Sequence, residues 1–321
     1  ISRPLESGSW GEGMDEAAAK LLEQANRKLF SVREHRVHPL KDDKVLTSWN
    51  GLMIAALAKG YQAMRNPLYL QAAGRSADFI LRVLRRDSGQ LLRRYREGDA
   101  DHPAYADDYA FLVWGLIELY ESAFADRYLD EALRLQQLML DLFWDEPHGG
   151  FFYTAHDAEN LIARNKEIYD GALPSSNSVA ALNLLRLARM GGDTMWEKKA
   201  EQLFQAFLRD VSNSPSAYTQ LLNAVDFALG PCKQIVIAGD LGAVETQKMI
   251  ETIHSVFLPN RVLLYQGKDS DAVRPAAMTP WATQGTGDRH PTVTLCENYS
   301  CKNPITDIEE LKAALTSQHV L

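Results

Sequence analysis

The stretch WNGLMIAALAKGYQAM, from Trp49 to Met64, decides the fold class, because it is a helix-length segment that is apolar on nearly every side. Its apolar residues recur at three- and four-residue spacing, which is typical of an α-helix, and Ser48 before it favours a helix start. A helix that is apolar nearly all round is buried. The next segment, Leu68 to Arg86, has the same spacing but carries more charge, which predicts a helix that covers the first one.

This order of an apolar helix and a more charged helix repeats along the chain. The further predicted pairs are Tyr105 to Ala123 with Tyr128 to Trp144, and Val179 to Met190 with Trp196 to Arg209. Helical spacing is also present in Ala17 to Leu29 and in Ala217 to Leu229. Repeated helical hairpins with buried inner helices and covering outer helices are typical of an α/α toroid.

The links between successive pairs are long, and each opens with a strand-like run, Leu91 to Tyr95 in one and Phe151 to Thr154 in the other. Long loops on one rim of a rigid scaffold are where functional residues concentrate. The inner helices are therefore expected to start at a functional rim.

The pattern changes after Gly230-Pro231. Gln234 to Ala238 and Arg261 to Tyr265 have strand character, and Val244 to Phe257 between them has helical spacing, so we predict a βαβ unit. A further strand is expected at Thr292 to Leu295, a loop over residues 266–291 and a last helix through Leu315. We predict a mainly α protein with an α/α toroid segment over residues 1–230 and a small α/β domain over residues 231–321.

The composition excludes several classes of protein. The 321 residues are 46% hydrophobic and 24% charged, as in globular proteins, and the net charge of -8 disfavours nucleic-acid binding. No apolar stretch is long enough to cross a membrane. Three cysteines cannot form a disulfide framework, so we expect a reducing compartment and a cytoplasmic protein. The start at Ile1 suggests a fragment or a processed product.

The first polar cluster lies at the start of an inner helix and contains Asp43, Lys44, Trp49 and Asn50. Carboxylate, ammonium and amide groups beside an indole can bind a polyhydroxylated ligand, with the ring stacked on an apolar sugar face. The alternative is a solvated turn with a helix cap and with Trp49 in the core.

The second cluster, Tyr105-Ala106-Asp107-Asp108-Tyr109, begins the next inner helix. Adjacent carboxylates can take different roles if one is desolvated and the other stays ionised. In that interpretation Asp107 or Asp108 is a general acid or base, Asp43 is the second carboxylate, and Tyr105 contacts the substrate. The alternative is stabilisation of the helix dipole, which explains one Asp better than two.

The third cluster lies before the following inner helix and contains Asp170, Ser175 and Asn177. Capping needs only one of these groups, so all three are candidate substrate-binding residues. Because the three clusters occupy equivalent positions in successive hairpins, we expect them to converge on one mouth of the toroid.

No metal or cofactor site is predicted. The eight histidines are scattered, and none lies in a predicted inner helix. Cys296 and Cys301, with Cys232, lack a fourth ligand for zinc and lack the two-residue redox spacing. We expect structural thiols or at most a labile disulfide. Walker, dinucleotide and nucleophile-elbow motifs are absent from the sequence.

Four blocks of sequence resemble the spermatogenesis-associated protein 20 family. The four blocks are Asp42 to Met53, Asp107 to Phe111, Asp170 to Ser178, and Cys296-Glu297-Asn298 with Cys301 and Pro304. The resemblance implies the C-terminal half of a longer protein that has an N-terminal thioredoxin-like domain, a six-hairpin glycosidase-like toroid and no defined activity. About three or four hairpins are present here, where the family's toroid has six.

The resemblance implies three functions, which the sequence leaves open. The leading one is a carbohydrate-active or carbohydrate-binding protein, in its enzymatic form a glycoside hydrolase that uses paired Asp residues. The second is a non-catalytic helical scaffold that partners the thioredoxin-like domain. The third is a sugar epimerase, which the absence of an inner-helix histidine disfavours. The expected partners are a sugar and that thioredoxin-like domain, and the expected cofactors are none.

Overall fold

The computed structural model describes residues 16–159, 162–191, 194–267, 290–297 and 300–316. The chain divides into two compact units, Ile1–Asp43 and Lys44–Leu321. The described part of the first unit contains helix α1 (Glu16–Glu34), which buries none of its residues. Its charged side chains pair one turn apart, as in Lys20 with Glu16 and Arg27 with Glu23.

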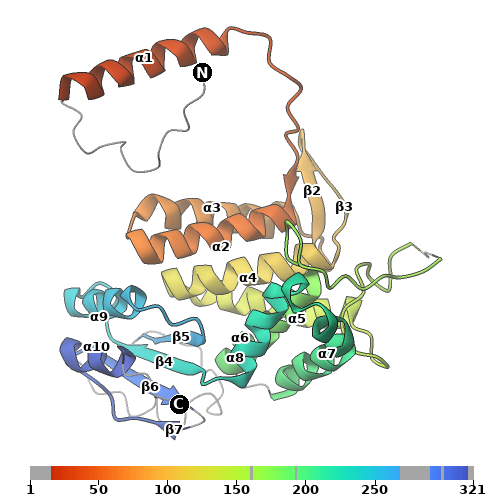
Figure 1. The fold of residues 1–321 in the computed structure, drawn as a ribbon, viewed down its shortest axis with the longest axis vertical. Helices are drawn as coiled ribbons and strands as arrows, with labels where there is room; N and C mark the ends of the chain where they lie inside the picture. The colour runs from red at the N-terminus through yellow and green to blue at the C-terminus, as the bar shows by residue number, and fades with distance from the viewer. Residues whose placement is uncertain (1–15, 160–161, 192–193, 268–289, 298–299, 317–321) are drawn as a thin grey trace. The chain divides into compact units, whose positions relative to one another are not determined.

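The second unit begins with helical hairpins (Figure 1). The helices are α2 (Thr47–Met64), α3 (Pro67–Val83), α4 (Ala106–Ala123), α5 (Asp126–Phe143), α6 (Ser176–Gly191), α7 (Thr194–Asn213) and α8 (Thr219–Leu229). Helices α2, α4, α6 and α8 pack side by side as the inner layer, and α3, α5 and α7 cover them. Nearly every residue of α4 is buried, whereas α5 and α7 bury only one face. The predicted α/α toroid segment is confirmed.

Two glycines bring the first two inner helices unusually close. A Cβ on Gly51 of α2 would lie 2.5 Å from the backbone carbon of Phe111, and one on Gly115 of α4 would lie 2.6 Å from the Gly51 carbonyl oxygen. Real Cβ atoms are not found at such distances from backbone, so only glycine fits either position. This close crossing fixes the start of α2 against α4.

A small antiparallel sheet lies beside the starts of α2 and α4 and contains β1 (Val45–Leu46), β2 (Leu92–Arg96) and β3 (Asp99–Pro103). Strand β2 was predicted from the sequence. The strand predicted at Phe151 to Thr154 is wrong, because this segment forms only an isolated bridge between Trp144 and Phe151. The Asn177 side chain binds both backbone groups of Phe151, which are then unavailable to a neighbouring strand.

The rest of the second unit is a four-stranded sheet with two helices. It contains β4 (Lys233–Ala238), α9 (Val244–Ser255), β5 (Arg261–Gln266), β6 (Thr292–Glu297), β7 (Ser300–Cys301) and α10 (Ile308–Thr316), with strand order β5-β4-β6-β7. Strands β4 and β5 are parallel around α9, so the predicted βαβ unit is confirmed.

Alternate residues of these strands face different layers, as the two-residue repeat of a strand requires. Ile235, Ile237 and Leu263 pack with α9 and α10, whereas Val236 and Leu264 join the core of the helical body. The sheet is therefore buried on both faces. The predicted loop over residues 266–291 lies almost wholly outside the described residues, and the domain boundary at Gly230 stays a prediction.

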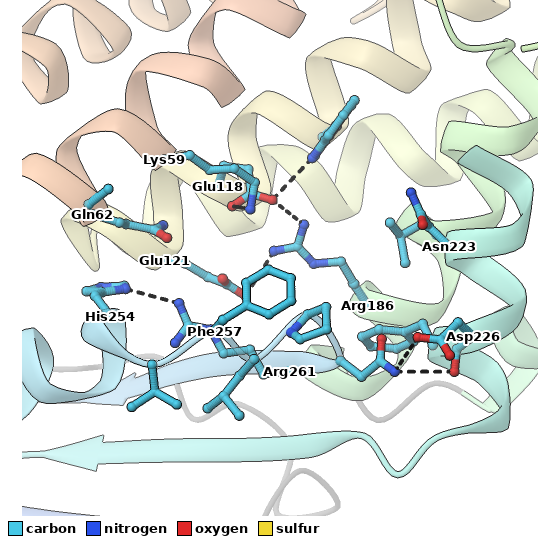
Figure 2. A pocket seen from close by; sticks show the side chains of 18 of the residues that line it. Lys59, Gln62, Glu118, Glu121, Arg186, Asn223, Asp226, His254, Phe257 and Arg261 are labelled. Carbon is cyan, nitrogen blue, oxygen red and sulfur yellow. Dashed lines mark hydrogen bonds and ion pairs between the residues drawn. The ribbon is translucent and has the colours of Figure 1, made fainter. Parts of the chain in front are cut away.

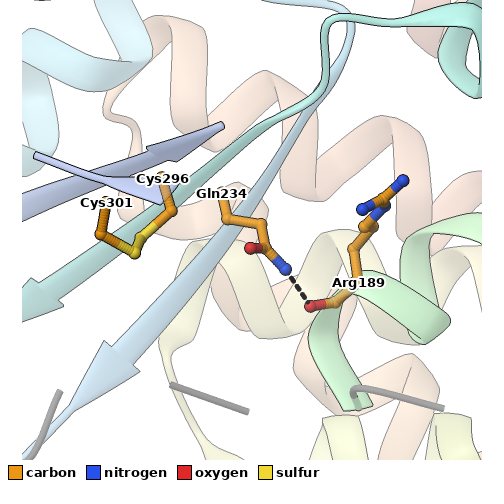
Figure 3. Close-up of a disulfide and its surroundings, with 4 residues drawn as sticks. All are labelled: Arg189, Gln234, Cys296 and Cys301. Atoms are coloured by element: carbon orange, nitrogen blue, oxygen red, sulfur yellow. Dashed lines mark hydrogen bonds between the residues drawn. A yellow bond between two sulfur atoms is a disulfide. The ribbon is translucent and has the colours of Figure 1, made fainter. Parts of the chain in front are cut away.

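Two features tie the sheet together and to the helices (Figure 3). A disulfide joins Cys296 to Cys301 across β6 and β7, and Cys232 is a free thiol. The Gln234 amide on β4 donates to the backbone carbonyl of Arg189 on α6, at 2.7 Å. Within the described ranges, no helix is both long enough and apolar enough to span a membrane.

Candidate functional site

The predicted functional rim is the place where β2 and the starts of α2 and α4 meet. Here Arg93, Tyr105, Asp107, Asp108 and Tyr153 lie together, and we call these five residues the rim cluster. Arg93 comes from β2, and Asp107 and Asp108 from the first turn of α4. The small sheet holds Arg93 in place, because Thr47 at the start of α2 donates its hydroxyl to the Leu92 carbonyl, at 2.6 Å.

One nitrogen of Arg93 contacts both carboxylates. Its Nη1 lies 3.1 Å from Asp107 Oδ1 and 2.9 Å from Asp108 Oδ2. Asp108 also accepts from the backbone N–H groups of Tyr105 and Ser48, each at 2.9 Å, and its side chain has no exposed surface. The Asp107 side chain is 17% exposed. Asp107 is therefore the carboxylate of this pair that can touch a ligand.

Burial changes the pKa values of Asp108 and Tyr153. Burial and the adjacent Asp107 raise the pKa of Asp108 to about 7, against the opposing charge of Arg93. Burial and Asp107 also raise the pKa of Tyr153, so its hydroxyl keeps its proton at neutral pH. A carboxyl whose pKa is near neutrality, beside a more accessible carboxylate, is the separation of roles expected at a functional site.

Two aromatic rings of the rim cluster contact each other and Arg93. The Tyr105 and Tyr153 rings stack with centroids 5.0 Å apart, and the Arg93 guanidinium lies over Tyr105 at 4.8 Å. Trp49, at the start of α2, is 61% exposed, so it is not a core residue. Asn50 instead joins secondary structure elements, since it donates to the Leu46 carbonyl and accepts from Ser76.

The polar residues of the third cluster are bound to backbone. Asp170 accepts from Ser175 N–H before α6 and from the N–H groups of Gln220 and Leu221 in the first turn of α8. Its Oδ2 also accepts from the hydroxyl of Ser178. One carboxylate thus joins the starts of two neighbouring inner helices.

Asp108 does the same for α2 and α4, because Ser48 and Tyr105 lie at the starts of these two helices. Ser175 caps α6 by accepting from the Ser178 N–H at 3.0 Å, and Asn177 anchors Phe151. Asp43 lies in the first compact unit and Lys44 begins the second, and both are exposed.

A second polar site, which we did not predict, lines a cavity of about 580 Å³ (Figure 2). Six charged residues lie on its walls, and we call five of them the cavity cluster: Lys59, Glu118, Glu121, Arg186 and Arg261. The sixth, Asp226, is exposed. Lys59 belongs to α2, both glutamates to α4 and Arg186 to α6, whereas Arg261 begins β5.

The glutamates of the cavity cluster are held by cations. Arg186 Nη1 lies 2.6 Å from Glu118 Oε1, and Arg186 Nη2 lies 3.1 Å from Glu121 Oε1. Glu118 also accepts from the Trp114 indole at 3.1 Å and pairs with Lys59 at 3.1 Å. Burial opposes ionisation of Glu118, but Arg186 and Lys59 outweigh it and hold the pKa of Glu118 below its usual range.

A sequence signal for the cavity cluster was present. Glu118, Glu121 and Arg186 are charged residues inside helices that are otherwise apolar nearly all round. A charged residue on a buried face must have a partner. No group of three His, Cys, Asp or Glu side chains in the described segments could hold a metal ion.

Curated relatives cover nearly the whole chain, although no family model matches it. Human spermatogenesis-associated protein 20 is 36% identical over 314 residues, which is 94% of this chain and 40% of the human protein. The chain is homologous to part of spermatogenesis-associated protein 20. The rat protein of that name is 34% identical over 94% of this chain and 39% of its own length. An uncharacterized Caenorhabditis elegans protein is 29% identical over 91% of this chain and 40% of its own length.

The resemblance to the spermatogenesis-associated protein 20 family is thereby confirmed, and the chain spans about 40% of the length of these relatives. Solved structures match more weakly. A cellobiose 2-epimerase from Bacillus thermoamylovorans is 17% identical, with a TM-score of 0.44 over 53% of this chain and 46% of its own. A family 105 glycoside hydrolase from C. acetobutylicum is 13% identical, with a TM-score of 0.44 over 60% of this chain and 56% of its own.

Proposed function

We propose that the rim cluster binds a carbohydrate and that Asp107 is the carboxylate that contacts it. The observation that carries this proposal is the shared Arg93 nitrogen, which holds one wholly buried carboxylate and one that reaches the surface. An accessible acceptor held by a guanidinium is a fixed, directional partner for sugar hydroxyls. Trp49, which is 61% exposed, offers a ring face on which a sugar can stack, whereas the Tyr105 and Tyr153 rings stack on each other.

The other candidate residues divide into two groups under this proposal. Lys44, Trp49 and Tyr105 contact the ligand. Asn50, Asp170, Ser175 and Asn177 keep the rim in shape, because the structure gives each of them backbone or side-chain partners from neighbouring elements.

The hydrolytic form of the proposal needs two carboxylates about 5 to 10 Å apart on either side of a glycosidic bond. Asp107 takes the role of general acid or base. Asp108 is closed off by its hydrogen bonds, so it acts as a positioning residue through Arg93. Asp43, the second carboxylate expected from the sequence, belongs to the other compact unit, and its role stays a prediction.

Isothermal titration calorimetry with neutral mono- and oligosaccharides tests the proposal. We expect a member of the panel to bind, and Asp107→Asn to weaken it by about tenfold or more, since a charge-assisted hydrogen bond is lost. The matched control is Asp210→Asn, which changes an exposed Asp on α7 and should leave binding unchanged. Absence of binding across the panel, or wild-type affinity in Asp107→Asn, would overturn the proposal.

One observation favours the scaffold as a second candidate function. Helix α2 exposes Trp49, Met53 and Met64, each by more than half of its surface. Exposed apolar side chains of this size on one helix are typical of a contact with another protein surface. Titration with a thioredoxin-like domain, followed by tryptophan fluorescence of the wild type and of Trp49→Phe, tests this candidate. A saturable change that Trp49→Phe loses supports it, and an unchanged wild-type spectrum contradicts it.

A further inference from the structure

We propose that the cavity between the inner helices and the α9–β5 loop is a second ligand site, which takes a small, singly charged carboxylate with hydroxyl groups, such as a uronate. This site is separate from the rim cluster and does not depend on the function proposed for it. The kind of ligand follows from four features of the cavity. These are its walls, its charges, the hydrogen-bond partners of Arg261 and the protonation state of His254.

The cavity has walls from both parts of the second unit. Helices α2, α4, α6 and α8 form one side, and residues 254–261 form the other. Phe257, in the loop between α9 and β5, is 90% exposed and lies over the cavity cluster in Figure 2. A volume of about 580 Å³ lies within the range for small-molecule sites, and Trp114 and Phe257 can contact the apolar face of a ring.

The charges that line the cavity are unevenly paired. Glu118 and Glu121 are its buried carboxylates, and both contact Arg186. Lys59, which pairs with Glu118, and Asp226, which accepts from the Asn260 amide at 2.8 Å, are both exposed, so solvent screens their charges. The two buried glutamates therefore match Arg186 and Arg261 in number, but among the described residues neither glutamate pairs with Arg261.

Arg261 is the cation without a carboxylate partner. Its Nη1 donates to the Ile253 carbonyl at 2.8 Å and its Nη2 to His254 Nδ1 at 3.1 Å. Among the residues that the structure describes, no carboxylate pairs with this guanidinium, and burial lowers the pKa of Arg261 against the attraction of Glu121 and Glu118. A buried guanidinium has donors left over in a planar fork, which matches a carboxylate.

His254 adds no charge to the cavity. Its Nδ1 accepts from Arg261, so the neutral ring carries its proton on Nε2. Burial, reinforced by Arg261 and Arg65, lowers the pKa of His254 to about 3. The Nε2 atom is shielded from solvent and has no hydrogen-bond partner in the described part of the chain. An anion bound beside Arg261 would offset the positive charge that helps to lower the pKa of His254.

A single guanidinium without a carboxylate partner favours a monoanion over a dianion, because Glu118 and Glu121 lie close enough to repel a second negative charge. Hydroxyl groups on the ligand match the amides of Gln220 and Asn223 on α8, which line the same cavity. Carboxylate, hydroxyls and an apolar ring face together describe a sugar acid.

Calorimetric titration of the full chain with glucuronate, glucose and inorganic phosphate, at one ionic strength, tests the proposal. We expect glucuronate to bind and the other two to bind about tenfold more weakly or not at all. Arg261→Gln should weaken glucuronate by about tenfold or more, and Phe257→Ala should weaken it by less. Asp107→Asn at the rim should leave glucuronate binding unchanged, which separates this site from the function proposed above.

A measurement on the wild-type chain covers the case in which Arg261→Gln does not fold. Glucuronate should shift the imidazole NMR signals of His254, whereas glucose should not, and the exposed His102 is the internal control. Equal affinity of Asp107→Asn for glucose and glucuronate, tighter binding of phosphate than of glucuronate, unchanged binding in both Arg261→Gln and Phe257→Ala, or loss of glucuronate in Asp107→Asn would each overturn the proposal.

Discussion

Helix α4 carries one carboxylate cluster near each end, and the two clusters are neutralised in different ways. At its start, Asp108 binds backbone N–H groups of two helices together with Arg93. In its last two turns, Glu118 and Glu121 are neutralised chiefly by the side chain of Arg186, and Glu121 also accepts from the Leu263 N–H at 3.2 Å. A carboxylate at a helix start receives donors that every helix leaves unpaired, whereas one inside a core needs a partner from elsewhere in the sequence.

The largest effect is expected where two buried carboxylates share one main counter-charge. Arg186→Met leaves Glu118 and Glu121 buried with Lys59 as the remaining close cation, and we expect the free energy of unfolding to fall by about 3–5 kcal/mol. Urea denaturation measures this. Arg189→Met, on the same helix but partly exposed, should cost about 1 kcal/mol or less. Equal losses in the two variants would contradict the assignment of Arg186 as the main counter-charge.

A smaller loss is expected at the rim, where hydrogen bonds rather than buried charge are removed. Asp170→Ala leaves three backbone N–H groups and the Ser178 hydroxyl without their acceptor. We expect the free energy of unfolding to fall by about 2–3 kcal/mol, and by less than about 0.5 kcal/mol in Asp210→Ala. A loss in Asp170→Ala as small as that control would contradict its role in joining α6 to α8.

The order of helices could be predicted from the sequence because each helix has its own periodicity and its own start or stop signal. Ser48, which was expected before the first helix, is instead the second residue of α2, whose N-cap is Leu46 and makes no side-chain cap hydrogen bond. Gly230 ends α8 with a positive φ of 68°. Strands β1 and β3 were missed, because two or five residues without apolar alternation give no periodic signal. The Phe151 segment was misassigned because its partner, Asn177, is a side chain distant in sequence.

The candidate site, like the fold, could be predicted only in part from the sequence. The polar residues at the inner-helix starts were found because capping is local, but their roles were not, since the extra acceptors of Asp108 and Asp170 serve a neighbouring helix. The cavity cluster was missed because Glu118, Arg186 and Arg261 meet only in three dimensions. His254 also lines that cavity. It was missed because only histidines in predicted inner helices were considered as site residues.

The smallest effects per pH unit are on the pH dependence of stability. They have opposite signs for His254 in the cavity and Asp108 at the rim. The pKa of His254 is lowered to about 3, so its contribution to stability is present above about pH 6.5 and is lost as the pH falls toward 3. The pKa of Asp108 is raised to about 7, so its contribution is present below about pH 4 and is lost as the pH rises toward 7.

Denaturation between pH 4 and 7 measures both contributions. His254→Gln should lower the slope of stability against pH, and Asp108→Asn should raise it, each by up to about 1.4 kcal/mol per pH unit. Parallel pH profiles for the two variants and the wild type would contradict both assignments.

The central claim is that this chain has two ligand sites of different chemistry, one at the rim and one in the cavity. The most direct measurement is a crosswise calorimetric titration of Asp107→Asn and Arg261→Gln with the neutral oligosaccharide that binds the wild type and with glucuronate. The account predicts that Asp107→Asn loses the neutral ligand alone and that Arg261→Gln loses glucuronate alone. Loss of both ligands in one variant, or of neither ligand in both variants, would contradict it.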